Sequence, residues 1–186
     1  IMSFGIHRLW KEKLIDWMSP QAGSSLIDVA SGTGDIAKLF LKKLNKNGVV
    51  TCVEPNSEML EQGRIKLKKF KSIKWINSQA EKLPFSEDTF DYYTISYGIR
   101  NVTNINVALK EAFRVLKPGG RFMCLEFSKI DNEILNFLYK QYSKTIPYLG
   151  KLIVGSDKPY KYLIDSIEKF YSSKELAELL KESGFS

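Results

Sequence analysis

A short apolar run that leads into a glycine-rich turn and then a helix is the feature that most constrains the fold of this chain. Residues 25–30 (SLIDVA) run into the turn 31–35 (SGTGD), and a helix is expected from Asp35 to about Leu44. A second apolar run, residues 48–54, ends in Glu54. Glycines at such a turn let the backbone approach a ligand closely at the carboxyl edge of a parallel sheet.

The alternation of strands and helices continues along most of the chain. Further strands are expected at residues 73–77, 90–96 and 121–127, and further helices at 7–18, 57–69, 104–116, 132–145, 160–170 and from the capping box Ser172-x-x-Glu175 onward. This order is typical of an α/β fold with a central, mostly parallel sheet and helices on both faces. We therefore expect that residues 1–186 form one domain. We also expect that a further N-terminal segment and further C-terminal edge strands of this domain lie outside this sequence.

Apolar spacing predicts which helix faces are buried. In the N-terminal helix, one stripe carries Ile6, Trp10, Leu14 and Trp17. In the helix at 104–116, the residues expected to point inward are Ile105, Ala108, Leu109, Ala112 and Phe113.

Several functional classes are disfavoured by residue types that are scarce. The chain has one histidine, His7, and no CxxC pair, so we expect no metal centre. No G-x-S-x-G elbow is present, which disfavours a Ser-His-Asp hydrolase. Cys52 and Cys124 lie in apolar runs and are interpreted as core residues.

The net charge is +7, and its location limits its meaning. Residues 38–74 hold ten basic and three acidic side chains, whereas the rest of the chain is balanced. This segment is either a solvated lysine-rich surface or a surface with weak attraction to an anionic membrane. A nucleic-acid site would need aromatic residues between the lysines, and Phe70 is nearly alone there, so we expect no nucleic-acid partner.

Two cofactors are compatible with the glycine turn, and charge favours one of them. The spacing Gly32-x-Gly34-x-x-Ala37 also fits a dinucleotide fingerprint. However, Asp28 and Asp35 flank the turn, and carboxylates would repel a pyrophosphate at the helix N-terminus. S-adenosylmethionine has no phosphate and offers an ammonium and a sulfonium, which acids attract. Glu54 is placed to bind a ribose diol, Gln79 to meet an adenine, and Ser96 to lie beside the reactive end of the cofactor.

Several segments then identify a family. Residues 2–10 (MSFGIHRLW), 96–102 (SYGIRNV) and 114–128 (RVLKPGGRFMCLEFS) resemble signature segments of the ubiquinone/menaquinone biosynthesis C-methyltransferases of the UbiE type. The resemblance covers essentially the whole chain. The family often has Gly at Ser31, Asp at Glu54 and Asn at Gln79, and each of these changes keeps a similar chemical group.

The resemblance implies a Rossmann-like class I methyltransferase that uses S-adenosyl-L-methionine and releases S-adenosyl-L-homocysteine. It places cofactor contacts on Thr33, Glu54, Gln79, Ala80 and Ser96, in addition to the turn residues Asp28, Gly32 and Gly34 described above. The implied acceptor is a ring carbon of a polyprenylated benzoquinol or of demethylmenaquinol.

The catalytic residues are expected near the end of the fourth strand. Arg100 would stabilise a quinolate oxygen and Asn101 would orient it. Arginine is a poor base, so water or a network bound to the quinol is expected to take up the proton. His7 is the other candidate for this role, because an unperturbed imidazole titrates at about 6.5. A helical segment around residues 129–170 is rich in aromatic side chains and is expected to cover the substrate.

Other interpretations stay open from the sequence alone. They are another small-molecule or RNA methyltransferase, and a non-catalytic subunit of a quinone-biosynthesis complex. A homodimer is a further prediction. The expected location is the cytoplasm of a bacterium, at the membrane periphery, or the matrix face of the inner mitochondrial membrane in a eukaryote.

Overall fold

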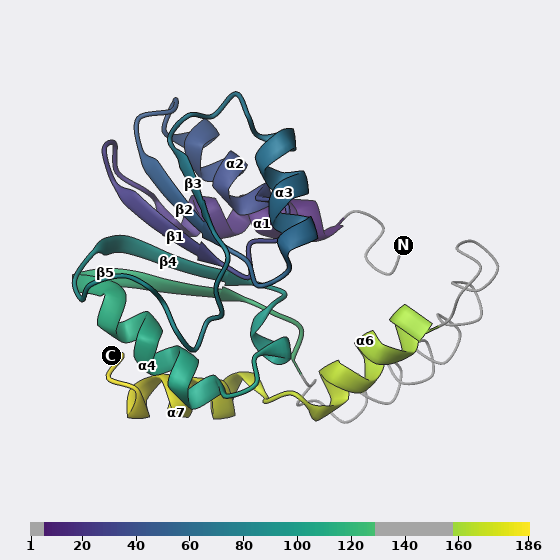
Figure 1. Ribbon diagram of the computed structural model, residues 1–186. Coiled ribbons are helices and arrows are strands. Elements are labelled where there is room, and N and C mark those ends of the chain that lie inside the picture. Colours follow the sequence, from purple (N-terminus) through teal and green to yellow (C-terminus); the bar gives the residue numbers. More distant parts are fainter. Residues whose placement is uncertain (1–5, 129–157) are drawn as a thin grey trace.

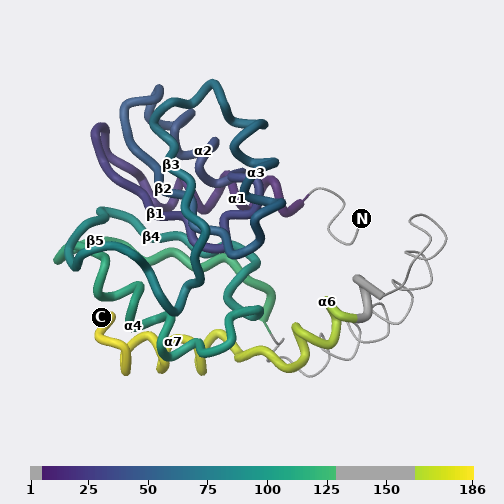
Figure 2. The backbone as a smooth tube through the Cα atoms, viewed as in Figure 1, coloured from purple at the N-terminus to yellow at the C-terminus, as the bar shows by residue number. Residues whose placement is uncertain are grey.

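The computed structural model describes residues 6–128 and 158–186 and contains a five-stranded, fully parallel sheet (Figures 1 and 2). The strand order is β3-β2-β1-β4-β5, so β1 is central. The strands are β1 (Ser25–Val29), β2 (Val49–Val53), β3 (Ile73–Ile76), β4 (Phe90–Ser96) and β5 (Leu116–Leu125). The expected α/β fold with a parallel sheet is confirmed.

Helices cover both faces of the sheet, as Figure 1 shows. They are α1 (Ile6–Met18), α2 (Asp35–Lys43), α3 (Ser57–Lys66), the 3-10 turn η1 (Ile99–Asn101), α4 (Ile105–Val115), α6 (Lys158–Lys169) and α7 (Ser173–Glu182). Asn56 and Asn104 cap α3 and α4, and Ser172 and Glu175 form the predicted capping box of α7. These caps satisfy backbone N–H groups that have no partner within a helix.

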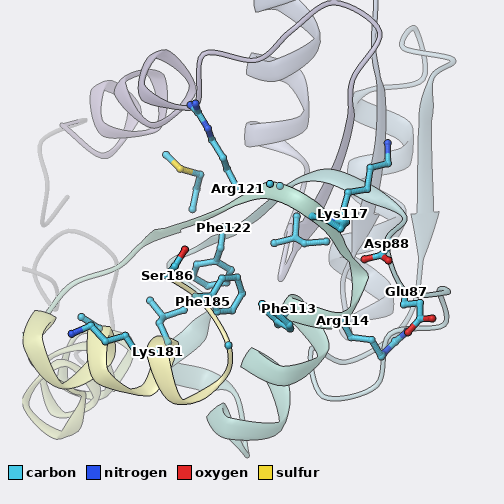
Figure 3. Close-up of a pocket in the computed structure, with 18 residues that line it drawn as sticks. Glu87, Asp88, Phe113, Arg114, Lys117, Arg121, Phe122, Lys181, Phe185 and Ser186 are labelled. Carbon is cyan, nitrogen blue, oxygen red and sulfur yellow. The ribbon is translucent and has the colours of Figure 1, made fainter.

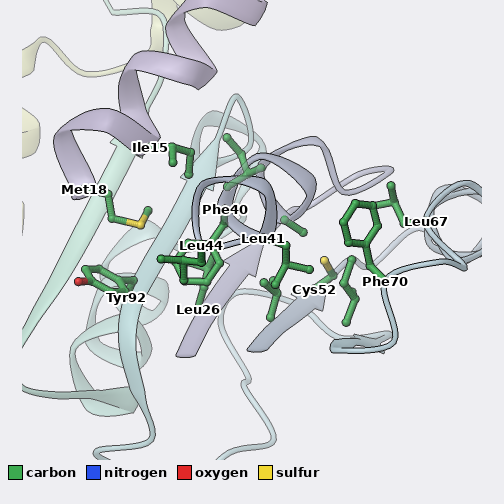
Figure 4. Packing of buried hydrophobic residues seen from close by; sticks show 14 of the residues in the cluster. Ile15, Met18, Leu26, Phe40, Leu41, Leu44, Cys52, Leu67, Phe70 and Tyr92 are labelled. Carbon is green, nitrogen blue, oxygen red and sulfur yellow. The ribbon is translucent and has the colours of Figure 1, made fainter. Parts of the chain in front are cut away.

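Two apolar clusters hold the layers together. The cluster under α1 and α2 includes Met18, Leu26, Phe40, Cys52 and Tyr92 (Figure 4). The cluster on the opposite face is built around α4, with the tail of α7 packed against it. Because β1 is buried on both faces, its sequence is apolar with hardly any alternation, as expected for a central parallel strand.

The predicted stripe of α1 is only partly correct. The buried side chains are Leu14, Ile15 and Met18, whereas Trp10 and Trp17 are exposed to 40% and 76%. The helix is apolar on two sides, and spacing alone does not tell which side meets the sheet. Of the predicted stripe, Leu14 is buried, whereas Ile6, Trp10 and Trp17 lie on a second, exposed apolar face.

Three further details differ from the sequence-based expectations or lie outside the described residues. Phe113 of α4 was expected to point inward but is 47% exposed, and it packs edge-to-face on Phe185. The turn residues 117–120 belong to β5, which pairs with β4 through a register shift between Phe90 and Tyr92. The helix expected at 132–145 lies outside the described residues. In the described part of the chain, no helix has the length and apolar character needed to cross a membrane.

Candidate functional site

A cavity of about 480 Å³ lies at the carboxyl ends of the central strands. Its walls come from the loops after β1, β2, β3 and β4, with Lys11 of α1 at its rim. The described lining residues include seven of the predicted site residues: Gly32, Thr33, Glu54, Gln79, Ala80, Ser96 and Asn101. Carboxyl ends of parallel strands meet at one edge, which is where open α/β sheets bind ligands.

The glycine turn forms one wall of the cavity and requires its glycines. Gly32 and Gly34 have φ angles of +56° and +79°, in the left-handed region that side chains disfavour. A Cβ on Gly34 would also lie 2.8 Å from both Leu67 and Trp75. Gly34 therefore packs closely against the end of α3 and against β3, whereas residues 31–33 of the turn line the cavity.

Glu54 connects the glycine turn to the end of β2. The carboxylate is buried and accepts hydrogen bonds from the backbone N–H of Gly32, at 2.8 Å, and of Asn56, at 3.0 Å. This acid thus fixes the distance between the two loops. Each carboxylate oxygen can accept more than one hydrogen bond, so a diol can still bind it.

Asp28 is a buried acid just below the turn. Its Oδ1 accepts a hydrogen bond from the Thr94 hydroxyl at 2.8 Å, and its Oδ2 has no partner in the described structure. Burial raises the pKa of Asp28 to about 7, although Thr94 and Lys11 oppose this shift. A cation bound nearby would favour the charged form of this carboxyl.

Asp35 has a different environment from the one the sequence suggested. Its two carboxylate oxygens bind the ammonium groups of Lys66, at 2.8 Å, and Lys11, at 3.0 Å. Partial burial raises its pKa, but Lys66 and Lys11 together lower it to about 2. Lys66 also donates to the Thr33 hydroxyl at 2.9 Å. Asp35 therefore tethers α1 and α3 to the turn, and its charge is already paired.

The opposite wall follows β4. Tyr97 has a φ of +58°, which is strained for a residue with a side chain, and its N–H donates to Leu125 at 2.7 Å. A Cβ on Gly98 would lie 2.4 Å from the Cβ of Ala30. The chain thus turns sharply after β4 and presents Ser96 and Tyr97 to the cavity.

The predicted catalytic residues are not all brought together. Asn101 lines the cavity, and its Oδ1 accepts a hydrogen bond from the Tyr162 hydroxyl of α6 at 2.8 Å. Arg100 lies behind this wall, in a buried ion pair with Glu126. His7 lies in the first turn of α1 and is not among the described residues that line the cavity.

Glu126, the buried partner of Arg100, is a residue near this edge that the sequence reasoning did not single out. A signal for it was present, because this acid follows the apolar run of β5 just as Glu54 follows that of β2. Because β2 and β5 belong to the same parallel sheet, both acids lie at the same edge, although β1 and β4 lie between the two strands.

Buried polar atoms without a partner are concentrated at this edge. In the described part of the chain these atoms are Asp28 Oδ2, Ser31 Oγ, Ser96 Oγ, Tyr97 Oη, Arg100 Nε and Glu126 Oε2. An unsatisfied buried polar atom costs about 1–3 kcal/mol, so such atoms are rare and need an explanation. Their gathering at the strand ends is what a site that binds polar ligands would require.

A larger cavity of about 950 Å³ lies elsewhere, along β5, α4 and α7 (Figure 3). Its walls include Phe113, Phe122, Arg114 and Lys181. None of the six unpartnered atoms belongs to the described residues that line it. Ser31, Ser96 and Tyr97, which carry three of these atoms, line the smaller cavity, which is therefore the candidate ligand site. Among the described residues, no group of histidine, cysteine and acidic side chains could hold a metal ion.

Solved structures share this architecture. A SAM-dependent methyltransferase from Aquifex aeolicus aligns with a TM-score of 0.68 and 19% identity, over 94% of this chain and 78% of that one. The YcgJ protein of Bacillus subtilis aligns with a TM-score of 0.69 and 21% identity, over 94% and 68%. The fold is the Rossmann-like fold of S-adenosylmethionine-dependent methyltransferases.

Sequence relatives define the family more narrowly. The model of the ubiE/COQ5 methyltransferase family matches residues 1–186. A relative from Rickettsia bellii, the ubiquinone/menaquinone biosynthesis C-methyltransferase UbiE, is 48% identical over 192 residues, which span all of this chain and 77% of that protein. The mitochondrial 2-methoxy-6-polyprenyl-1,4-benzoquinol methylase of Dictyostelium discoideum is 43% identical over 217 residues, all of this chain and 69% of that protein. The chain belongs to the ubiE/COQ5 methyltransferase family.

The buried carboxyl of Asp28 gives a pH test of this geometry. The unfolded chain releases the Asp28 proton near pH 4, whereas the folded chain keeps it to about pH 7. Folding stability is therefore lost as pH rises through this window, by up to roughly 4 kcal/mol at about 1.4 kcal/mol per pKa unit. Asp28→Asn removes this loss, so its stability relative to the wild type should increase from pH 4 to pH 8 in urea unfolding.

Asp16→Asn is the matched control, because Asp16 is exposed and its pKa is lowered by Lys43. It should show a small change of the opposite sign. An Asp28→Asn variant whose stability relative to the wild type is the same at both pH values would contradict the assignment.

Proposed function

We propose that this chain is a C-methyltransferase of quinone biosynthesis that transfers a methyl group from S-adenosylmethionine to a ring carbon of a polyprenylated quinol. Family membership over the whole chain supports the reaction class. The observation that carries the proposal in the structure is the gathering of unpartnered polar atoms around the cavity at the strand ends.

The residues present fit the cofactor. Glu54, buried at the end of β2, would bind the ribose hydroxyls, and the backbone of the glycine turn would lie against the methionine part. Ionised Asp28, whose Oδ2 has no partner in the described structure, would attract its positive charge. Gln79, Ala80 and Met59 line the part of the cavity suited to an adenine. When bound, the cofactor supplies an electrophilic methyl group on sulfur.

The acceptor would bind on the β4 side of the cavity. Ser96 and Tyr97 provide hydroxyl groups there, and Asn101, held by Tyr162, provides an amide. Arg100 provides a positive charge behind them that can stabilise a quinolate oxygen. These groups would hold the quinol hydroxyls and stabilise the oxyanion formed when one hydroxyl loses its proton, and this loss increases electron density on the neighbouring ring carbon. His7 stays a second candidate for proton transfer.

The chemistry of the acceptor follows from the relatives. The Dictyostelium protein is named for a 2-methoxy-6-polyprenyl-1,4-benzoquinol, and the Rickettsia protein for both ubiquinone and menaquinone biosynthesis. We propose the reduced benzoquinol, the reduced demethylmenaquinol, or both as acceptors. A homodimer and an assembly with other proteins of quinone biosynthesis stay predictions.

We also propose weak peripheral association with a membrane that holds this lipid acceptor. The exposed face of α1 carries Ile6, Leu9, Trp10 and Trp17 with Lys13 among them. Nine of the ten basic side chains in residues 38–74 are exposed, and the tenth, Lys38, is half-buried. Lys43 of α2 pairs with Asp16 of α1. Indole rings favour the membrane interface, and basic residues favour anionic lipid by about 1 kcal/mol each. The location at a bacterial or mitochondrial membrane rests on this proposal.

Two measurements test the cofactor and the acceptor. The protein should bind S-adenosylhomocysteine but not NAD in calorimetry, and should transfer a labelled methyl group to a reduced short-chain benzoquinol or naphthoquinol. Glu54→Gln loses a charged hydrogen-bond acceptor worth about 1.5–3 kcal/mol, so its affinity should fall by about 10–100-fold. Glu58→Gln, on the exposed first turn of α3, is the control and should bind like the wild type. Folded protein that binds NAD, or that methylates neither quinol, would refute the proposal.

Membrane association is tested with vesicles of neutral phosphatidylcholine, with and without phosphatidylglycerol. Binding should increase with the anionic lipid, decrease with salt, and weaken in Trp17→Ala. Because the Trp17 side chain is exposed, Trp17→Ala is expected to fold like the wild type, so weaker binding would reflect the lost indole ring. Binding that is the same on neutral and anionic vesicles would rule out the electrostatic part of the proposal.

A further inference from the structure

Glu126 lies at the edge of the site and has no role in the function proposed above. We propose that its carboxylate takes up the proton that the acceptor hydroxyl loses, which leaves the Arg100 charge to stabilise the resulting oxyanion. This inference rests on the proposed quinol methylation, because it assigns the base of that reaction.

The strand register brings the residues of this cluster together. β4 and β5 pair in parallel, with Ser96 opposite Leu125. Tyr97 follows the last residue of β4, and Glu126 follows the last residue of β5. The Tyr97 N–H donates to the Leu125 carbonyl at 2.7 Å. The short turn η1 then places Arg100 against Glu126. The carboxylate thus lies at the same edge as the β4 wall of the cavity, one residue beyond the end of β5.

The contacts of Glu126 leave one of its oxygens available. Oε1 accepts hydrogen bonds from Arg100 Nη1 and from the backbone N–H of Phe127, the latter at 2.9 Å. Oε2 and Arg100 Nε are both buried and have no partner within the described structure. A carboxylate that served only as a structural partner of arginine would be expected to use both oxygens in a two-pronged pair. The free oxygen points to a second partner.

The surroundings increase the basicity of this carboxylate. The side chain is only 3% exposed, and the Phe127 ring beside it packs at 5.1 Å from the Tyr97 ring and 5.9 Å from the Trp10 ring. Burial raises the pKa of Glu126, while Arg100 opposes the shift. A general base works best when its pKa is near the operating pH.

The proton balance of the reaction fits this pair. The quinol O–H bond breaks and its proton binds Glu126 Oε2, directly or through one water, because Glu126 is not among the described lining residues. The ion pair, neutral before this step, then has a net charge of +1 beside the new oxyanion. The ring carbon would then form a bond to the methyl group that bound S-adenosylmethionine supplies, and the electron pair of the bond between sulfur and methyl would stay with the departing S-adenosylhomocysteine. The ring carbon then releases its own proton to solvent, and Glu126 returns its proton to the oxygen.

Glu126 is the group of this cluster expected to titrate in the useful pH range. Tyr97 and Cys124 face it from β4 and β5, and burial raises the pKa of each to about 12. Arg100 of η1 stays protonated. Lys11 of α1 lies farther out, 6.0 Å from the centre of the Tyr97 ring.

The test is the pH dependence of Glu126→Gln, which keeps the shape of the side chain but cannot take up the proton. It is measured anaerobically between pH 6 and 10 with a reduced short-chain 2-methoxy-1,4-benzoquinol. Near pH 7, kcat should fall by about 100-fold with KM changed less than about threefold. As the pH increases, the rate of Glu126→Gln should rise about tenfold per pH unit, because the quinol ionises in solution. The wild-type rate should stay constant above the pKa of Glu126. S-adenosylhomocysteine affinity should stay near wild type, whereas the melting temperature should fall, because Arg100 loses the charge of its buried partner.

Glu111→Gln is the matched control, because Glu111 pairs with Arg114 away from the cavity, and it should keep the wild-type pH profile. If Glu126→Gln does not fold, Glu126→Asp replaces it; this variant keeps a carboxylate and should keep a flat profile at a lower rate. Three outcomes would overturn this inference while leaving the proposed function in place. They are a wild-type rate in Glu126→Gln, a loss of rate in Glu126→Gln that is equal at every pH, and a pH profile of Glu126→Asp that slopes. A wild-type protein that methylates no quinol would overturn the proposed function as well.

Discussion

The parallel pairing of five strands is the constraint on which the rest of the structure depends. Because every strand runs in the same direction, every residue that ends a strand reaches the same edge. Glu54 from β2, Ser96 from β4 and Glu126 from β5 are far apart in the sequence but share this edge. The apolar clusters on both faces stabilise the sheet and thereby fix the relative positions of these polar groups.

The polar edge reduces the stability of the protein in the absence of ligand. Asp28 is buried with an unpartnered oxygen, Tyr97 has a strained backbone, and Glu126 uses one oxygen only. Such features persist where the surrounding packing enforces them, and they are typical of functional sites. The same groups that weaken the fold are those that the proposed cofactor and quinol would satisfy.

Local sequence was sufficient to predict most of the elements, although β5 begins five residues earlier than expected, and it also predicted seven of the residues that line the cavity. The boundaries of β4, the caps of α3 and α7, and the glycine turn all follow from short-range rules. Tertiary contacts were not predictable in this way. The pairing of Asp35 with Lys11 and Lys66 joins three helices, and the exposed face of α1 depends on which side of an apolar helix meets the sheet.

Hydrogen exchange with and without S-adenosylhomocysteine tests most directly whether the edge of the sheet is the ligand site. Backbone amides of residues 30–35, 54–59 and 96–101 should gain protection, because the ligand satisfies and orders these loops. Amides of residues 113–123 and 177–185, around the larger cavity, should not change. Protection confined to the larger cavity, with none at the three loops, would contradict the account.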